Sequence, residues 1–262
     1  MFFKKQRKQL QSDPFVQFSS KLHEFEKIIA ATKSKLLFSD PKKYWYPYNT
    51  LASILEFEPI LTGEHRDIIK LIAHRPFADI GAADGDLGFF IESFGLKNIH
   101  IIDHAPSNCN GLEGARLLKQ SFNSSASIHD IDLDAAYSFP EKRFGLVALL
   151  GTLYHLKNPF LMLETLARHA DFCLTSTRIA AYLPGGKKNI STSPIAYLLD
   201  DHECNDDPTN FWVFTEAGLK RLFARTGWDI LDFGTCGGKK STPASMKDMQ
   251  RAFCLVRSRN EL

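Results

Sequence analysis

The sequence predicts an α/β fold, with a doubly wound, mainly parallel sheet of seven strands that ends in an antiparallel edge strand. From Phe77 onward, short apolar runs alternate with amphipathic helical patterns, as in parallel sheets with helices on both faces. The last two apolar runs are joined by a Gly-, Lys- and Ser-rich loop over 237–247, too short for a crossover helix, so they form a hairpin. At 262 residues and 44% apolar composition, the chain suffices for one such domain with additions.

An N-terminal helical extension, residues 1–74, precedes the sheet. Its first part is one long amphipathic helix, because apolar residues recur there at helical spacing: Phe15, Phe18, Leu22, Phe25, Ile29 and Leu36. Asp40-Pro41 breaks the pattern, and a loop with four aromatic residues from Tyr44 to Tyr48 follows. This loop either covers a ligand or pins the connection to a core. Two short helices over 50–57 and 64–74 then lead to the first strand.

Residues 75–262 form the sheet domain. The strands that we predict span 77–80, 99–103, 126–129, 145–150, 172–175, 228–234 and 251–257. The predicted helices span 87–94, 111–122, 158–169 and 215–226. The alternation stops for nearly forty residues after Thr175, and we interpret residues 176–210 as an insertion over the ligand site, where long loops usually shape specificity.

Charge and composition restrict the class of protein. The net charge is +2, but residues 1–48 hold ten Lys and Arg against four Asp and Glu, an excess of six. This basic end either meets an anionic partner or is a solvated helix face. No apolar run reaches the roughly 18 residues of a membrane helix, and no signal-peptide core is visible, so we expect a cytoplasmic protein. The five cysteines are odd in number and lack a Cys-x-x-Cys pair, which indicates reduced thiols.

The stretch Phe77-Ala-Asp-Ile-Gly-Ala-Ala-Asp-Gly-Asp-Leu-Gly88 predicts a strand, a tight turn and a helix start. Gly81 and Gly85 allow positive φ or close approach of a ligand, so a nucleotide-like ligand fits there. A dinucleotide-binding turn also places glycines between a strand and a helix. However, the second and third glycine positions of that pattern are occupied here by Ala83 and Asp86. Asp79, two residues before the first glycine, also favours a different class of nucleotide-binding protein.

The pattern acid-x-Gly-x-Ala-x-Gly resembles the first motif of class I S-adenosylmethionine (SAM) methyltransferases, which have a Rossmann-like sheet. The resemblance implies that Asp79 organises a turn wrapped around the methionine end of SAM, with the turn formed by Gly81, Ala82, Ala83 and Gly85. Asp103, 18 residues after Gly85, falls where the family places the carboxylate that accepts the ribose hydroxyls. Asp130 resembles the acid that contacts adenine, with Ile131 packing on the ring. Asp132 is a rival for the role of Asp130.

A second motif follows the fourth predicted strand, in the stretch from Gly145 to Pro159. Its residues that we assign to the cofactor site are Leu150, Gly151 and Tyr154. His155 is the candidate general base, although it is as well suited to hydrogen-bond its own loop. The ending Leu-Tyr-His-Leu-x-Asn-Pro, with Asn210-Phe-Trp-Val-Phe-Thr-Glu further on, resembles a subgroup that includes the carboxymethyl-transferring enzymes of the tRNA wobble uridine. The resemblance covers roughly residues 75–235.

From these motifs we expect a SAM-dependent methyltransferase acting on an oxygen or nitrogen of a small-molecule acceptor. Candidate acceptor-binding residues are Arg178, Tyr182, Asn210 and Trp212. Two alternatives stay open: a tRNA-modifying methyl or carboxymethyl transferase, and a SAM-binding protein without catalysis. Ordinary SAM is expected as cofactor, because a planar guanidinium suits the extra carboxylate of the carboxylated form and the subgroup's Arg-Asn is Thr209-Asn210 here. Arg178 or Lys43 from another loop is the alternative source of such a charge. We expect no metal, since the acidic run 200–207 matches no ligand spacing. Nothing in the sequence indicates an oligomeric state.

Overall fold

A computed structural model describes residues 13–72, 74–244 and 247–260. The chain divides into two compact units, the first comprising residues up to Ile131 with Phe144–Leu146, and the second Asp132–Arg143 with Val147 onward. The strand order is β3-β2-β1-β4-β5-β7-β6, and strand β4 (Phe144–Leu150) contributes residues to both units. The predicted mixed α/β sheet is therefore confirmed.

The first unit holds the parallel strands β1 (Phe77–Ile80), β2 (Ile99–Asp103) and β3 (Ser127–Asp130). They are joined by the helices α5 (Asp86–Glu92) and α6 (Glu113–Phe122). All residues of β1 are buried, as expected for a strand inside a parallel sheet. In the register, Asp79 is opposite Ile101 and Asp103 is opposite Asp130, so the predicted acidic residues end neighbouring strands.

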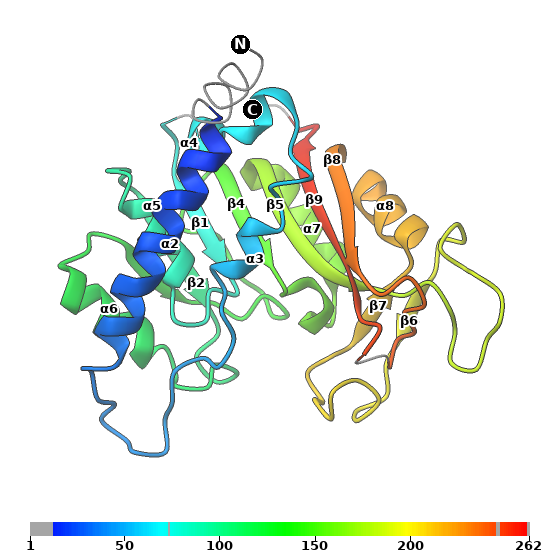
Figure 1. The fold of residues 1–262 in the computed structure, drawn as a ribbon, viewed down its shortest axis with the longest axis horizontal. Coiled ribbons are helices and arrows are strands. Elements are labelled where there is room, and N and C mark those ends of the chain that lie inside the picture. The colour runs from blue at the N-terminus through cyan, green and yellow to red at the C-terminus, as the bar shows by residue number, and fades with distance from the viewer. Residues whose placement is uncertain (1–12, 73, 245–246, 261–262) are drawn as a thin grey trace, which may run out of the picture. The chain divides into compact units, whose positions relative to one another are not determined.

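Helix α2 (Pro14–Lys33) forms the first part of the N-terminal extension (Figure 1). Asp13 caps it by accepting a hydrogen bond from the Phe15 amide, and Pro14 suits the first helical position. Its buried residues are five of the predicted apolar set: Phe15, Phe18, Leu22, Phe25 and Ile29. Aromatic contacts with α5 and α6 hold this face in place, as the Phe18 and Phe90 ring centroids lie 5.0 Å apart and those of Phe25 and Phe122 lie 5.8 Å apart.

The short helices that follow differ from the prediction. Helix α3 (Ala52–Leu55) is shorter than expected. The predicted helix over 64–74 is divided into the 3-10 helix η1 (Gly63–Arg66) and helix α4 (Ile68–Ile72). Asp67 causes the division, because its backbone leaves the helical region (φ −94°, ψ 82°).

The second unit is built around strand β5 (Ala170–Ile179), which is longer at both ends than predicted. Strand β9 (Gln250–Ser258) runs antiparallel to β5 and also to strand β8 (Trp228–Gly237). The predicted hairpin of the last two strands and the antiparallel edge are thus confirmed. The helices of this unit, α7 (Pro159–His169) and α8 (Glu216–Arg225), agree with the prediction to within one residue at each end.

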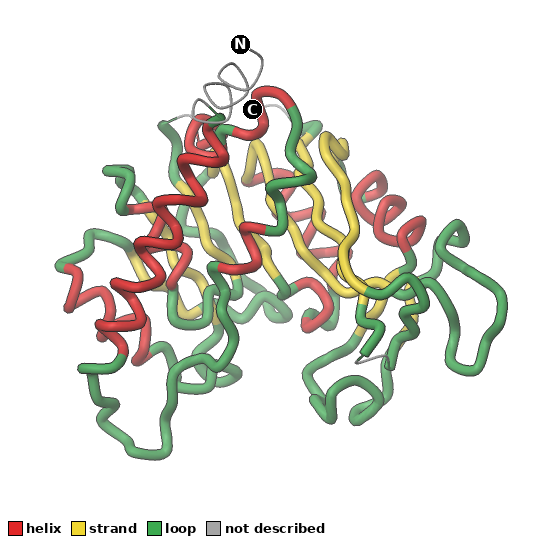
Figure 2. The backbone as a smooth tube through the Cα atoms, viewed as in Figure 1, coloured by secondary structure: helices red, strands yellow, loops and turns green. Residues whose placement is uncertain are grey.

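The segment between Thr175 and Asn210 is mostly loop (Figure 2). It nevertheless contains strand β6 (Ala196–Leu198), which pairs antiparallel with strand β7 (Trp212–Phe214). Strand β7 in turn pairs parallel with β5 at a single position, Ile179 opposite Phe214. Three-residue strands carry too few side chains to show a period of two, which is why the sequence did not indicate them.

None of the helices in the described part of the chain is long and apolar enough to cross a membrane. All five cysteines are free thiols, as predicted, and Cys173, Cys204 and Cys254 are buried. The basic stretch Met1 to Lys8 lies outside the described residues.

Candidate functional site

The glycine-rich turn follows β1 in the first unit. Gly81 and Gly85 both have positive φ (69° and 81°), and so does Ala83 (53°), a conformation uncommon outside glycine. A side chain at Gly88 would place its Cβ 2.7 Å from Ile101 Cγ1. The absence of a side chain at Gly88 therefore allows α5 to pack closely on β2. This glycine is two residues beyond Asp86, the third position of the dinucleotide pattern.

Asp79 and Asp103 both bind backbone amides around this turn. Asp79 Oδ2 accepts a hydrogen bond from the Gly88 amide (3.1 Å), and Asp103 accepts from the Ala83 (2.6 Å) and His104 (2.7 Å) amides. Burial, opposed by the Gly88 bond and reinforced by the charges of neighbouring carboxylates, raises the pKa of Asp79 to about 7. Burial also raises the pKa of Asp103. Both carboxylates therefore organise the turn, one from each neighbouring strand.

A buried ionic network ties the N-terminal extension to the same turn. Lys33 at the end of α2 donates to Asp84 Oδ2 (2.9 Å) and to Asp86 Oδ2 (2.8 Å). Asp84 also accepts from the Tyr46 amide (2.9 Å) and from Asn110 Nδ2 (2.8 Å). No role was predicted for this network from the sequence, although Asp84 and Asp86 flank Gly85 in the motif. The aromatic loop is thus bonded to the turn through the backbone of Tyr46.

The charge around the turn suits a cationic ligand. Four carboxylates surround it, those of Asp79, Asp84, Asp86 and Asp103, and all but the last belong to buried residues. Among the described residues, the cation bonded to this group is Lys33, whose pKa is raised by Asp86 and Asp84 despite its burial. SAM carries a sulfonium and an ammonium group, whereas a dinucleotide would bring a pyrophosphate against these acids. The residues present therefore fit SAM.

The predicted adenine-contacting residues lie at the carboxyl end of β3 in this unit. The Ile131 amide donates to the Asp103 carbonyl (2.9 Å), and Asp130 Oδ1 accepts from the Ala105 amide (2.8 Å). The rival Asp132 accepts from the amide of Asp134 instead (2.9 Å). The first unit thus brings together the eight predicted cofactor residues that it contains: Asp79, Gly81, Ala82, Ala83, Gly85, Asp103, Asp130 and Ile131.

The other predicted cofactor residues belong to the second unit, where β4 ends at Leu150. Gly151 adopts positive φ (73°) and donates its amide to the Ser176 carbonyl (2.9 Å), so the chain turns beside β5. The 3-10 helix η2 (Leu153–His155) follows and presents Tyr154, whose carbonyl accepts from the Phe211 amide (2.9 Å).

His155 hydrogen-bonds Thr209 in this unit. Its Nδ1 lies 3.0 Å from the Thr209 carbonyl oxygen and 3.0 Å from Thr209 Oγ1. Since a carbonyl only accepts, Nδ1 carries the proton, and the lone pair of the neutral ring is on Nε2. Burial and the charge of Arg251 lower the pKa of His155, against the effects of Thr209 and Asp207, which keeps the ring neutral at pH 7. The loop bond and the base role are therefore compatible.

The predicted acceptor-binding residues have varied surroundings. Arg178 is buried on β5 and donates to Cys204 Sγ, with longer bonds to Asn205 and the Pro243 carbonyl. Asn210, also buried, donates to the Cys204 carbonyl (3.1 Å), and Trp212 Nε1 donates to the Lys157 carbonyl (3.3 Å). The Tyr182 amide donates to the Ser241 carbonyl (3.0 Å). Arg178 and Asn210 thus converge on one loop.

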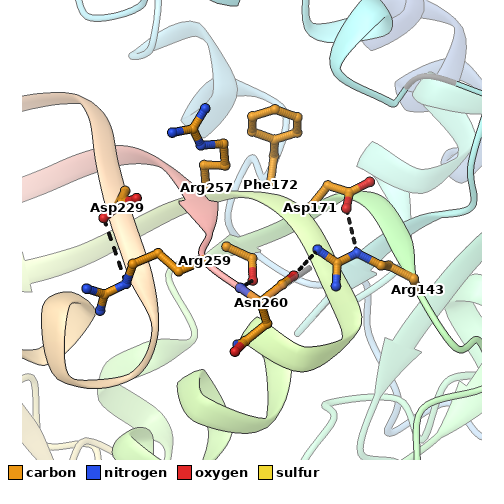
Figure 3. Close-up of a pocket in the computed structure, with 8 residues that line it drawn as sticks. Arg143, Asp171, Phe172, Asp229, Arg257, Arg259 and Asn260 are labelled. Carbon is orange, nitrogen blue, oxygen red and sulfur yellow. Dashed lines mark hydrogen bonds and ion pairs between the residues drawn. The ribbon is translucent and has the colours of Figure 1, made fainter. Parts of the chain in front are cut away.

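A separate cavity of about 490 Å³ lies at the amino end of β5 (Figure 3). None of the predicted site residues lines it. Two of its three arginines point at acids: Arg143 Nε lies 2.5 Å from Asp171 Oδ1, and Arg259 Nε lies 3.8 Å from Asp229 Oδ1. Among the described residues, no group of three or more His, Cys, Asp or Glu side chains is arranged to hold a metal ion.

No protein-family model and no curated protein matches the chain. Solved structures do resemble it. The N-terminal domain of EvdMO1, crystallised in the presence of SAH and D-fucose, is 13% identical over 89% of this chain and 97% of that domain, with a TM-score of 0.56. The longer EvdMO1 structure is 14% identical over 89% of this chain and 48% of its own length (TM-score 0.53). This chain therefore spans about half of that protein.

A SAM-dependent methyltransferase from Clostridium acetobutylicum is also similar, with 13% identity over 74% of this chain and 89% of its own and a TM-score of 0.50. At these identities the similarity concerns the fold. The chain has the Rossmann-like fold of solved SAM-dependent methyltransferases.

Proposed function

We propose that this protein is a class I SAM-dependent methyltransferase that methylates an oxygen or nitrogen of a small-molecule acceptor. The observation that carries the proposal is the acidic glycine turn, in which Asp79 and Asp103 bind the turn amides while Asp84 and Asp86 flank Gly85. A cationic cofactor offsets this negative charge, and the fold is that of SAM-dependent methyltransferases. Residues 75–262 form the SAM-binding domain, residues 1–74 its helical extension, and residues 176–210 shape the acceptor site.

Each assigned residue has a separate task. The backbone from Gly81 to Gly85 holds the methionine end of SAM, Asp103 accepts from the ribose hydroxyls, and Asp130 and Ile131 hold the adenine. In the second unit, Leu150, Gly151 and Tyr154 are the further residues that we assign to SAM. When bound, SAM supplies an electrophilic methyl group for in-line displacement, so the protein mainly aligns the acceptor and excludes water.

His155 removes a proton from the acceptor where one must be lost. Its Nδ1 proton is held by the Thr209 carbonyl, which leaves Nε2 as the base. Thr209 is itself positioned by its hydroxyl bond to Asp207 Oδ1 (2.6 Å). These hydrogen bonds, which link Asp207 to Thr209 and Thr209 to His155, fix the tautomer of the ring. A carboxylate or carbonyl that accepts from Nδ1 of a catalytic histidine has the same effect. Arg178, Tyr182, Asn210 and Trp212 belong to the acceptor region.

Calorimetric titration of the full chain with SAM, SAH and NAD tests the cofactor. We expect SAM and SAH to bind and NAD not to bind, and the reverse preference would refute the proposal. Formation of SAH in the presence of an acceptor then separates an enzyme from a SAM-binding protein without catalysis. A shift in tRNA mobility at physiological salt, weakening strongly as salt rises, would move the acceptor from a small molecule to tRNA.

A further inference from the structure

Arg251, on strand β9, has a guanidinium that the proposed roles do not use. A Cβ placed on Gly151 would be 3.1 Å from Arg251 Nη2, so this guanidinium lies against the turn that ends β4. Its Cζ atom is 5.8 Å from the centre of the Tyr154 ring. The charge of Arg251 also lowers the pKa of His155, whose main cause is burial. Arg251 therefore borders the residues assigned to cofactor and base.

This arginine forms no ion pair with a carboxylate among the described residues. Its cross-strand neighbours are Arg178 on β5 and Cys236 on β8. Directly opposite residues of an antiparallel pair lie on the same face of the sheet, where like charges destabilise. Arg251 therefore lies beside a second, buried arginine, and no carboxylate of the described residues forms an ion pair with Arg251 itself.

The cavity at the other end of β5 is lined by three arginines, of which Arg257 has no ion pair drawn in Figure 3 and the other two face acids. There Arg143 is paired with Asp171, and Arg259 is paired with Asp229 (Figure 3). The same sheet thus pairs these arginines with acids at one end and sets Arg251 beside another arginine at the other. A planar guanidinium in this situation is suited to bind a carboxylate or phosphate through two parallel hydrogen bonds.

We infer that the acceptor carries an anionic group, a carboxylate or a phosphate, and that Arg251 binds it beside Gly151 and Tyr154. This inference rests on the proposed function, since it names the class of acceptor for the same site. Binding the anion there would place the rest of the acceptor next to His155, within the second unit. Arg251 is then a specificity-determining residue, which distinguishes anionic from neutral acceptors.

The test uses the SAH-loaded full chain and three small probes of similar shape: 4-hydroxybenzoate, phenyl phosphate and the uncharged 4-hydroxybenzamide. Arg251→Gln is compared with Arg257→Gln, which removes an arginine from the same strand outside the site. We expect at least one anionic probe to bind the wild-type protein and Arg257→Gln about tenfold more tightly than it binds Arg251→Gln. The amide should bind all three proteins equally, and their affinity for SAH should agree within about twofold.

Anion binding that Arg251→Gln leaves unchanged, or no preference of the wild type for an anion over the amide, would overturn the inference. Tighter binding of carboxylated SAM than of SAM, lost in Arg251→Gln, would assign the guanidinium to the cofactor and also overturn it. Absence of SAH binding would refute the proposed function instead. In that case the probes are titrated without SAH. A loss of affinity for the anionic probes in Arg251→Gln then still decides whether Arg251 binds an anion.

Discussion

Substitution of Lys33 by methionine tests whether the N-terminal extension holds the cofactor turn. Methionine keeps the length and apolar stem of the side chain and removes the ammonium group. The Lys33 side chain is 15% exposed, and those of Asp84 and Asp86 are 1% and 11% exposed, so water screens this network poorly. At 2.8–2.9 Å and an effective dielectric constant of about 20, each contact corresponds to about 6 kcal/mol before desolvation.

The net effect is smaller, because the desolvation of all three charges opposes the attraction. Removing one partner of a buried ion pair typically costs about 3–5 kcal/mol, since it leaves uncompensated buried charge. We therefore expect Lys33→Met to lower the free energy of unfolding by about that amount in urea denaturation at pH 7. Lys21→Met on the same helix is the matched control, because Lys21 is exposed and its ammonium contacts the Phe94 ring (4.0 Å) and the Ser93 carbonyl (3.4 Å) rather than buried acids.

The pH dependence separates lost charge from lost packing. Burial already raises the pKa of Asp86 against the effect of Lys33, and without the ammonium the pKa of Asp86 rises further. The folded variant then binds more protons than its unfolded chain. The difference in free energy of unfolding between Lys33→Met and the wild type should therefore shrink as the pH falls from 7 towards 5. Lys33→Met combined with Asp86→Asn should recover part of the loss. If the urea midpoint of Lys33→Met equalled that of Lys21→Met at every pH, the reasoning would be refuted.

Three further predictions concern the turn itself. Burial raises the pKa of Asp79 from 3.8 to about 7, so the folded state retains a proton there that the unfolded chain has lost. The free energy of unfolding should therefore fall as the pH rises from about 4 to 7, by at most about 1.4 kcal/mol per pH unit. Asp79→Asn should flatten that decline in urea titrations, and an unchanged slope would contradict the assignment. Gly85→Ala should destabilise by about 1–3 kcal/mol more than Gly95→Ala, because both have φ of 81° but only at Gly85 does a Cβ meet neighbouring atoms; equal thermal shifts would disprove the steric argument. Asp103→Ala should weaken SAM roughly 100-fold by calorimetry, as two charge-assisted hydrogen bonds are lost, while Asp132→Ala should not; an unchanged affinity in Asp103→Ala would place the ribose site elsewhere.

Local patterns were sufficient for most of the elements. The apolar spacing of α2 correctly gave its buried face, from Phe15 to Ile29, because helical periodicity repeats within the segment itself. The same is true of β1 and the glycine turn, where φ is set by residues next to each other in sequence. The predictions were wrong where a segment was too short to show a period, as at β6 and β7. They were also wrong at Asp67, where residues outside the local segment determine the backbone conformation.

Roles of single residues required long-range contacts. Arg178 was predicted to face the acceptor from its place after the fifth strand, yet it donates hydrogen bonds to Cys204 Sγ, Asn205 Oδ1 and the Pro243 carbonyl. Its role in the acceptor site stays a prediction. The sequence suited His155 equally to the role of a base and to that of a loop anchor. The Thr209 contact shows that Nδ1 anchors the loop, and the base role of Nε2 stays a prediction.

By itself, the sequence determined the α/β class, the glycine turn and the acids that end successive strands, because each is written in residues a few positions apart. The tertiary structure alone decided that Lys33 neutralises acids more than fifty positions further along the chain and that Arg251 lies against Gly151. Such contacts depend on strand order, register and helix docking. Those are fixed by packing across the whole unit, and no local period records them.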